Sequence, residues 1–528
     1  MKKILKNKNH QPPFILLILD GWGVAPPNKG NAIELAKKPN FDFFWNHYPH
    51  TLLQASDGYV GLPLAQHGNS EAGHMNLGAG RLVEQDAVRI SREINTGQFF
   101  KNPAFTAACQ HIKKNKSDLH LMGMLATSQS AHADPDHLLA LLACSRIHKI
   151  KNVYLHLFTD GRDSPPHASL KLVEALIRQL KNKGNGHRSS GEWIATLMGR
   201  FYAMDRKKEW PRTEAAYNAM VLGKGLAAKS PQAAITQAYN RGETDEFIPP
   251  YVMKRNGEPL GKIKDGDAVI FFNLRSDRAR QLAKAFVQTK FNSAANSGAF
   301  VRKKVLHNLA FVAMTDFGPD LDAILSAFPA LDLVNTLPPT LAGYRQLYLA
   351  EKEKYAHVTY FFNGGYTAPL ANEDWLMVPS PAVDSYDQVP AMSVNMITEK
   401  VLHYLPDYNF MTVNFANADM VGHTGNLPAC IKAVEAVDVC LGKVAAAVKK
   451  RHGTLIITAD HGNAEKMIDL KTGEVYTEHT SNPVPFILVE PKRSQRRLKK
   501  GKLGDVAPTI LKLMNLPRPR EMTGKSLY

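Results

Sequence analysis

Short, continuous apolar runs alternate along the chain with longer segments in which apolar residues recur at helical spacing. An apolar run without polar alternation is typical of a parallel strand that is buried on both faces. Such runs include residues 14–19, 119–125, 153–158, 268–272, 305–313, 410–415 and 454–458. Helical spacing covers residues 136–146, 169–180 and 429–449, and a further helix is expected to begin at Pro211 and to end at Gly223. Strands that alternate with helices predict an α/β protein with parallel sheets.

Aspartate and histidine, which are common metal ligands, follow three of these apolar runs. Asp20 follows the first run, Asp419 and His423 follow a second, and Asp460 and His461 follow a third. Ligands of open α/β sheets bind beyond the carboxyl ends of the strands, so these side chains are expected at one sheet edge. Carboxylate and imidazole groups without thiolate suit manganese or zinc. A single aspartate after a strand is more often a turn or helix cap, but the combined set favours a site for two metal ions.

A glycine-rich segment, His67-Gly-Asn-Ser-Glu-Ala-Gly-His74, places a serine where a helix is expected to begin. The free N–H groups of a helix N-terminus favour an anion. By itself, Ser70 would be interpreted as an N-cap with Glu71 in the first turn. Beside a metal site, Ser70 becomes a candidate nucleophile, because coordination activates a hydroxyl group. In the same way, His479 would by itself be a loop histidine and becomes a candidate ligand only with the others.

Arginine residues gather in the middle of the chain, each time after an apolar stretch. They are Arg162 with Asp163, Arg200 with Arg206, and Arg275 with Arg278. The planar guanidinium group binds carboxylate and phosphate groups through two parallel hydrogen bonds. For any one arginine a surface ion pair is the better interpretation, but the group as a whole predicts a site for a small, multiply charged anion.

Composition excludes several classes of protein. The 528 residues are 44% hydrophobic and 21% charged, as in a globular protein of several domains. The four cysteines form no CxxC pair, which disfavours a disulfide framework or a zinc–thiolate site and fits a reducing cytosol. The first apolar run is too short for a signal peptide, and no stretch approaches the ~20 apolar residues of a membrane span. We therefore expect a cytoplasmic protein without a membrane partner.

The net charge of +17 favours anionic partners. Part of this charge lies in two basic runs, at Lys2, Lys3, Lys6 and Lys8 and at residues 492–502. Neither run is interleaved with aromatic residues, so a solvated surface is expected rather than a nucleic-acid arm. A small phosphorylated molecule is the better candidate partner.

Longer motifs identify a family. They are Leu19-Asp-Gly-Trp-Gly23, Gly68-Asn-Ser-Glu-Ala-Gly-His74, Asp160-Gly-Arg-Asp163, Glu353-Lys-Tyr-Ala-His-Val-Thr359, Asn414-Phe-Ala-Asn-Ala-Asp-Met-Val-Gly-His-Thr424 and Glu521-Met-Thr-Gly-Lys-Ser-Leu527. In these motifs, which run nearly from end to end, the chain closely resembles the cofactor-independent (2,3-bisphosphoglycerate-independent) phosphoglycerate mutases of the alkaline-phosphatase superfamily. The resemblance implies interconversion of 3-phosphoglycerate and 2-phosphoglycerate without 2,3-bisphosphoglycerate, by a protein that is expected to be a monomer.

The resemblance also implies a domain organisation. A metal-binding, alkaline-phosphatase-like parallel-sheet domain would comprise residues 1–82 and 318–528, and an α/β phosphoglycerate-binding (transferase) domain, residues 83–317, would be inserted in it. Two manganese ions are implied, the first held by Asp20, Ser70, Asp460 and His461 and the second by Asp419, His423 and His479. The implied substrate contacts are His132, Arg162, Asp163, Arg200, Arg206, Arg275, Arg278 and Lys354.

The family's chemistry assigns roles to three of these residues. Ser70 would attack phosphorus and form a phosphoserine, and the retained glycerate would reorient so that its 2-hydroxyl takes the phosphoryl group back. Asp163 would be the base for that hydroxyl, and Lys354 would stabilise the transferring charge. A related metal-dependent phosphatase, sulfatase or phosphopentomutase is the nearest alternative, and an inactive, basic nucleic-acid-binding protein is a more distant one.

Two positions depart from the family's pattern. The family usually has Gly-Gly-Val-His-Ser-His where this chain has Ser128-Gln-Ser-Ala-His132-Ala-Asp134, so that His132 corresponds only with a one-residue insertion and the second histidine becomes Asp134. Tyr366 also follows Gly364-Gly365 where an arginine is usual. These departures predict a shifted substrate preference or a reduced rate.

Overall fold

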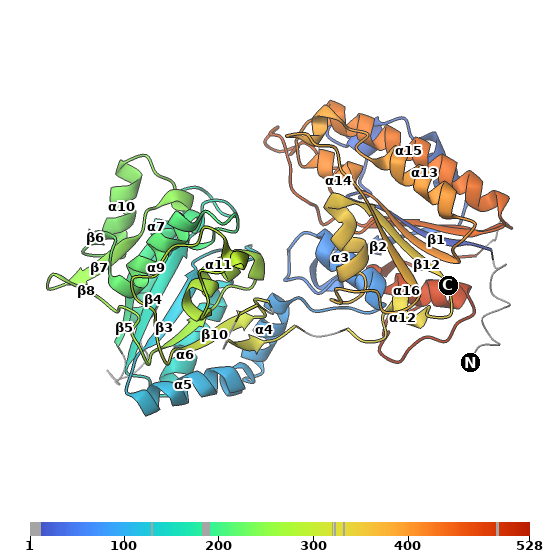
Figure 1. The fold of residues 1–528 in the computed structure, drawn as a ribbon. Coiled ribbons are helices and arrows are strands. Elements are labelled where there is room, and N and C mark those ends of the chain that lie inside the picture. Colours follow the sequence, from blue (N-terminus) through green and yellow to red (C-terminus); the bar gives the residue numbers. More distant parts are fainter. Residues whose placement is uncertain are drawn as a thin grey trace. The chain divides into compact units, whose positions relative to one another are not determined.

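The computed structural model describes residues 12–127, 130–181, 191–318, 320–321, 324–330, 333–492 and 496–528. The basic run at residues 2–8, part of the second run and most of the polar stretch 181–191 lie outside these residues. The chain forms two compact units, one made of Met1–Gln85 with Leu331–Tyr528 and the other of Asp86–Ala330. In each unit, a sheet is covered by helices (Figure 1).

The first unit contains an eight-stranded sheet among the described residues, in the order β13-β12-β14-β1-β15-β16-β2-β17. Its strands are β1 (Phe14–Leu19), β2 (His50–Gln54), β12 (Gln346–Glu351), β13 (Glu373–Val378), β14 (Phe410–Phe415), β15 (Thr454–Thr458), β16 (Val484–Val489) and β17 (Gly501–Lys502). The strands from β13 to β15 are parallel. Because β1 is in the middle of the sheet, all six of its residues are buried, as its continuous apolar sequence predicts.

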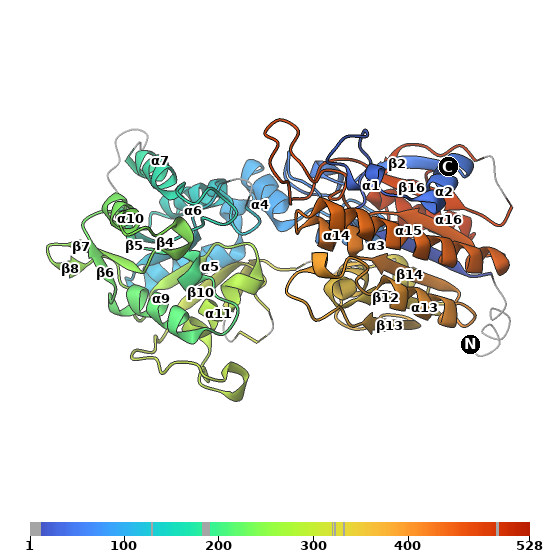
Figure 2. The ribbon, with the colours of Figure 1, turned by 90° about the horizontal axis from the view of Figure 1, so that it is seen from above.

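Helices pack on both faces of this sheet. They are α1 (Ala32–Leu35), α2 (Pro39–His47), α3 (Ser70–Ala79), α12 (Leu337–Thr340), α13 (Val394–Tyr404), α14 (Asn417–Gly422), α15 (Leu427–Lys450) and α16 (Val506–Leu513). The long helices α13 and α15 lie on one face, and α3 and α16 lie on the other (Figures 1 and 2). Loops and the short helix α14 follow the carboxyl ends of the parallel strands.

One buried acid joins two helices of the first unit. The Asp438 side chain of α15 accepts the backbone N–H of Phe41 at 2.7 Å and that of Asn40 at 3.1 Å. These N–H groups belong to the first turn of α2, where Lys38, the N-cap, makes no side-chain capping bond. Asp438 is fully buried, so it takes the place of the missing local cap.

We expect the substitution Asp438→Ala to lower the free energy of unfolding by about 1–3 kcal/mol, because it leaves buried N–H groups without an acceptor. Urea unfolding measures this change. Glu435 of the same helix accepts the backbone N–H of Lys37 at the exposed rim, so Glu435→Ala serves as the matched control and is expected to change stability by less than about 0.5 kcal/mol. Equal losses in the two variants would contradict this account.

The second unit has a nine-stranded sheet among its described residues, in the order β11-β10-β9-β3-β4-β5-β7-β6 with β8 beside β7. Its strands are β3 (Leu119–Met124), β4 (Asn152–Thr159), β5 (Gly191–Gly199), β6 (Leu226–Ala228), β7 (Tyr251–Arg255), β8 (Glu258–Pro259), β9 (Ala268–Phe271), β10 (Ala310–Thr315) and β11 (Ile324–Phe328). Its helices are α4 (Asp86–Asn95), α5 (Pro103–Asn115), α6 (Pro135–Ile147), α7 (Ser169–Lys181), α8 (Arg200–Ala203), α9 (Trp210–Leu222), α10 (Pro231–Asn240) and α11 (Ser276–Val287).

The strands of the second unit contribute alternate residues to two cores. Leu119 and Leu121 of β3 belong to the core that also contains residues of α5 and α6. Met122 and Met124 belong to the core that contains residues of α9 and α11. Both sets are apolar because helices cover both faces, which explains the continuous apolar runs in the sequence.

The structure corrects two expectations. The strand expected at residues 305–313 begins only at Ala310, because Val305 is exposed and the N–H of His307 is bonded to Asp265 instead of a neighbouring strand. The second unit extends to Ala330 rather than to residue 317, because β11 pairs with β10 and continues the sheet. None of the described helices combines the length and apolar composition that crossing a membrane requires.

Candidate active site

Three neighbouring strands of the first unit deliver the acids that the sequence singles out. Strand β1 lies between β14 and β15, and Asp20 and Asp460 come one and two residues after β1 and β15. Asp419 lies in α14, which begins two residues after β14. All three carboxyl groups are buried, with 0–2% of their surface exposed. Parallel strands end at the same edge of a sheet, so the three acids converge there.

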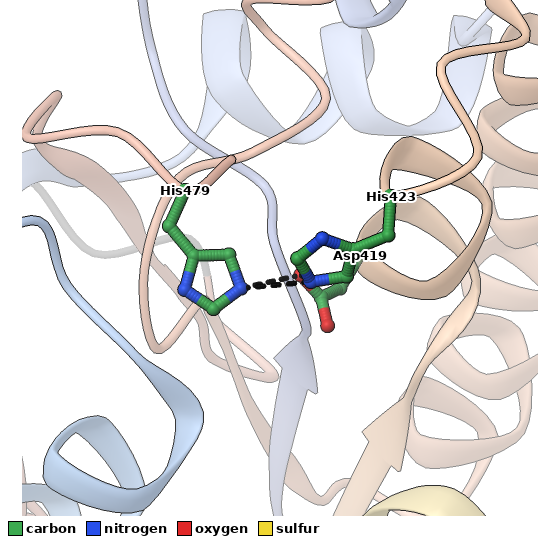
Figure 3. Close-up of side chains that lie close together, drawn as sticks. All are labelled: Asp419, His423 and His479. Carbon is green, nitrogen blue, oxygen red and sulfur yellow. Dashed lines mark hydrogen bonds and ion pairs between the residues drawn. The ribbon is translucent and has the colours of Figure 1, made fainter. Parts of the chain in front are cut away.

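Asp419, His423 and His479 form a group that could hold a metal ion (Figure 3). The Nε2 atoms of His423 and His479 lie 3.3 and 3.2 Å from Asp419 Oδ1 and only 3.0 Å from each other. Each Nδ1 faces a backbone carbonyl at 2.8 Å, of Thr477 and Gly68 respectively. As neutral imidazoles whose Nδ1–H donates to these carbonyls, His423 and His479 direct two Nε2 lone pairs toward each other and toward the Asp419 carboxylate, and these groups repel one another. A cation between them and Asp419 removes this repulsion, so the donor set fits a metal.

A second group surrounds Ser70. The Ser70 hydroxyl lies 2.9 Å from Nε2 of His461 and 3.3 Å from Oδ1 of Asp20. His461 Nε2 is also 3.5 Å from Asp20 and 3.4 Å from Asp460. The buried Oδ2 atom of Asp460 has no hydrogen-bond partner among the described residues. This oxygen lies 3.2 Å from Nδ1 of His74 and 3.4 Å from Nε2 of His461, so it belongs to a set of oxygen and nitrogen donors that a second cation would fit.

Lys354 connects the two groups. Its amine lies 2.6 Å from Asp20 Oδ1, 2.7 Å from the Ser70 hydroxyl and 2.7 Å from Asp419 Oδ2. Burial lowers the pKa of Lys354, but Asp20 and Asp419 outweigh burial and raise that pKa above its ordinary value. Lys354 is therefore an ammonium group at neutral pH, and it lies where negative charge would develop on a phosphoryl group.

The acids respond differently to this environment. Burial, followed by the charge of Asp460, raises the pKa of Asp20 to about 7, although Lys354 opposes the rise. Burial also acts to raise the pKa of Asp460, but His461 and His74 outweigh it and hold that pKa below its ordinary value. Closely spaced buried carboxylates repel one another, and a divalent cation is the group that would let all of them ionise.

Ser70 is not the N-cap that its position in the sequence suggests. Asn69 is the N-cap of α3, and its side chain accepts the N–H of Ala72 at 2.8 Å. Ser70 is the first residue of the helix, so its hydroxyl is available at the positive end of the helix dipole. The glycine before the cap is required by space, because a Cβ atom at Gly68 would lie 2.2 Å from the Ala55 carbonyl oxygen.

Three polar residues of this site were not identified from the sequence, although His74 and Asn414 lie within the family motifs and Asn463 follows His461 by two residues. Asn414 donates to Asp20 at 2.7 Å and to Nε2 of His74 at 3.0 Å. Nδ1 of His74 faces the carbonyl of Ser70 at 2.9 Å. Both His74 nitrogens are thus engaged, so His74 supports Ser70 rather than offering a free lone pair. Asn463 donates to Asp419 at 2.8 Å.

The second unit holds the predicted substrate contacts other than Lys354. Arg200 is 3% exposed and donates to Asp160 at 2.6 Å and to Asp163 at 2.9 Å. Burial raises the pKa of Asp163, but Arg200 outweighs it and lowers that pKa. Burial, followed by Arg200, lowers the pKa of His132 to about 4, so this imidazole is neutral at physiological pH.

Other arginines lie close to the ion pair between Arg200 and Asp163. Burial, followed by the charges of Arg206, Arg200 and Arg162, lowers the pKa of Arg278. Arg206 donates to Asp277 at 2.7 Å, and Arg275 lies 3.8 Å from the same acid. The arginines whose charges lower the pKa of Arg278 make a local excess of positive charge, which favours an anionic ligand.

The loop that departs from the family's pattern has a partial structural explanation. Ser128 and Gln129 lie outside the described residues. Asp134 is the N-cap of α6, where its carboxylate accepts the N–H of Asp136 at 2.8 Å. The acid therefore stabilises the start of a helix. His132 lies 3.9 Å from Asp163.

Known proteins match this chain over nearly its whole length. The Metalloenzyme superfamily model matches residues 12–518. The 2,3-bisphosphoglycerate-independent phosphoglycerate mutase of Moorella thermoacetica is 47% identical over 98% of both chains. That of Clostridium perfringens strain SM101 is 47% identical over 98% of this chain and 99% of its own. The chain belongs to the 2,3-bisphosphoglycerate-independent phosphoglycerate mutase family.

A solved structure from the same group of enzymes supports the fold. The crystal structure of Leishmania mexicana phosphoglycerate mutase at low cobalt concentration covers 99% of both chains with 30% sequence identity and a TM-score of 0.76. The sequence resemblance to phosphoglycerate mutases and the α/β fold class with parallel sheets are thereby confirmed. Membership of a metalloenzyme superfamily and the donor groups described above support dependence on a divalent metal.

Proposed function

We propose that this protein interconverts 3-phosphoglycerate and 2-phosphoglycerate through a phosphoserine at Ser70. The observation that carries the proposal is the Ser70 hydroxyl, which lies beside His461, Asp20 and the Lys354 ammonium at the N-terminus of α3. A hydroxyl group in this position can take up a phosphoryl group, because hydrogen-bond donors surround it and the Lys354 ammonium offsets the negative charge of that group.

Two manganese ions are the proposed cofactors. Asp20, Ser70, Asp460 and His461 hold one, and Asp419, His423 and His479 hold the other. When bound, the metal ions lower the pKa of the serine hydroxyl and offset the charge of the phosphoryl group.

The remaining roles belong to the chain itself. Ser70 attacks phosphorus, and Lys354 stabilises the negative charge on the transferring group. His132, Arg162, Arg200, Arg206, Arg275 and Arg278 bind the carboxylate, hydroxyl and phosphate groups of the substrate. Asp163 takes the proton of the substrate hydroxyl that receives the phosphoryl group. In this scheme, the first unit is the metal-binding domain and the second unit, Asp86–Ala330, is the phosphoglycerate-binding domain. The monomeric state and the cytoplasmic location stay predictions.

The direct test is conversion of 3-phosphoglycerate by the purified chain with manganese and without 2,3-bisphosphoglycerate, while free phosphate is measured. We expect 2-phosphoglycerate with little phosphate release. Release of phosphate alone would indicate a phosphatase instead of a mutase. Such a result would mean that the altered segment at residues 128–134 admits water to the site. Absence of both products would refute the proposal for this substrate.

We expect Arg278→Ala to raise KM for 3-phosphoglycerate by roughly 10–100-fold, because the variant loses a charged hydrogen bond worth about 1.5–3 kcal/mol. Steady-state kinetics over a range of substrate concentrations measure the change. Arg255 of β7, which is exposed and lies over the Trp193 ring, provides the control, and Arg255→Ala should leave KM within about twofold. An unchanged KM in Arg278→Ala would remove Arg278 from the proposed substrate site.

A further inference from the structure

Glu351 is a buried acid that the reaction described above does not use. It ends β12, three residues before Lys354, and none of its surface is exposed. Its Oε2 atom accepts the hydroxyl of Ser380 at 2.8 Å, whereas Oε1 has no hydrogen-bond partner among the described residues. A buried carboxylate with an unpartnered oxygen is costly. Its presence therefore requires a reason in the surrounding structure.

The turn that carries Lys354 is attached to one loop, residues 379–393. Glu351 is the N-cap of this short turn, Lys352–Lys354. Ser380 of the loop donates to Glu351, and the Tyr386 hydroxyl donates to Glu353 at 2.9 Å. Both acids at the turn are thus held by the same segment.

The 379–393 loop also holds the helix that carries Asp419. Asn417, the first residue of α14, donates to the carbonyl of Pro390 at 2.9 Å. Asn426, the N-cap of α15, donates to Asp387 at 3.0 Å. The loop therefore connects the turn that carries Lys354 with the helix that carries one of its ion-pair partners. A hydrogen bond from Ser393 to the Pro379 carbonyl, 2.6 Å long, joins the two ends of the loop.

We propose that Glu351 is a positioning residue for Lys354, which it keeps within bonding distance of Ser70 by anchoring the Lys352–Lys354 turn on Ser380. The inference rests on the proposed function of Ser70 and Lys354. The Lys354 amine meets three oxygen atoms at 2.6–2.7 Å, so a small displacement of the turn breaks several of these contacts at once. Displacements of about 1 Å near reacting groups cost on the order of 10²-fold in rate.

The charge of Glu351 is sensitive to pH near neutrality. Burial raises its pKa to about 7, against the hydrogen bonds from Ser380 and from the backbone of Ser393. Among the charged groups that face Glu351, Glu353 raises its pKa further and Lys354 lowers it. The Tyr386 phenol also lies near both acids, whose charges contribute, after burial, to the rise in its own pKa. When the pH falls through about 7, Glu351 takes up a proton. The anchor then loses its charged acceptor and its attraction for Lys354.

The test compares Glu351→Gln, Glu351→Ala and Ser380→Ala with the control Glu399→Gln in the full-length protein at saturating manganese. Glu399 is an exposed acid of α13 near the same loop. We expect kcat to fall about tenfold in Glu351→Gln and about 10²-fold in Glu351→Ala, with KM within about twofold. Ser380→Ala, which keeps the charge, should lie between these variants and the control. Manganese affinity should stay close to that of Glu399→Gln in every variant that folds, and Tm should do so in Glu351→Gln.

The pH profile separates positioning from a merely structural contribution. In the wild type, kcat should fall as the pH drops through the Glu351 pKa of about 7, whereas Glu351→Gln should already have the lower kcat and change little over that range. Equal kcat in the Glu351 variants and in Glu399→Gln would overturn the inference, as would an unaltered pH profile in Glu351→Gln. If Glu351→Ala fails to fold, the comparison of Glu351→Gln with Ser380→Ala decides. A wild type without mutase activity would instead refute the proposed function.

Discussion

Ser70→Ala is expected to abolish the interconversion of 3-phosphoglycerate and 2-phosphoglycerate, with a loss of at least about 10³-fold in kcat. The loss follows from the geometry, because the variant removes the oxygen atom that lies 2.9 Å from His461 and 2.7 Å from Lys354. Within the part of the chain that the structure describes, no other hydroxyl group makes these contacts. Incubation with substrate should therefore give a phosphorylated wild-type protein and an unphosphorylated variant, which intact-protein mass spectrometry distinguishes.

The fold of this variant should survive. Asn69, and not Ser70, caps α3, so the substitution removes no capping bond and Tm should change by only a few degrees. Ser526 donates its hydroxyl to the backbone near the C-terminus, and Ser526→Ala is the matched control with expected wild-type activity. A Ser70→Ala protein that keeps more than a tenth of the activity, or that still becomes phosphorylated, would exclude Ser70 as the nucleophile.

Removal of divalent metal is expected to eliminate activity and to lower stability without unfolding the protein. Without a cation, the Nε2 lone pairs of His423 and His479 face each other at 3.0 Å. The Lys354 ammonium still pairs with Asp20 and Asp419, so part of the buried charge stays compensated. A ligand at a hundred times its Kd stabilises the native state by about 2.7 kcal/mol per site. Chelation should therefore produce a clear fall in Tm.

Thermal unfolding with chelator, and again after manganese is restored, measures this effect. Activity and Tm should recover together. The Ser70→Ala variant keeps six of the seven proposed ligands, so chelator should still lower its Tm although it has no activity. His423→Ala should remove about half of this response, because it disrupts one of the two proposed sites and leaves the ligands of the other in place. A Tm that is insensitive to chelator in the wild type would contradict a resident metal at these groups.

The local features of the site could be predicted because short segments determine them. The apolar runs 14–19, 410–415 and 454–458 coincide with β1, β14 and β15, and the acids that follow them are adjacent in the sequence to those strands. By contrast, the strand expected at residues 305–313 shows where hydrophobicity alone misleads. Val305 is exposed, and the loop there is held by a hydrogen bond from His307 to Asp265, 42 positions earlier. Such a contact leaves no local pattern in the sequence.

Several decisive contacts join residues that are hundreds of positions apart. Lys354 reaches Asp20 and Ser70 across 334 and 284 positions, and Asp438 caps α2 from 397 positions away. Asn69 caps α3 through a local contact, but the sequence alone does not show whether Asn69 or Ser70 is the N-cap. The backbone conformation at the start of α3 decides it. The supporting roles of His74 and Asn414 also became visible only when both were found beside Asp20 and Ser70.

The sequence by itself therefore determined the α/β class, the central strands β1, β3, β4, β9, β14 and β15, the family and the residue types at the strand ends. Hydrophobic periodicity and adjacent polar residues are local properties of the chain. The tertiary structure decided that β1 lies between β14 and β15, that His423 and His479 face each other and that Lys354 stands between two acids and a serine. Strand order and side-chain convergence depend on packing between distant segments, and no short window of sequence contains that information.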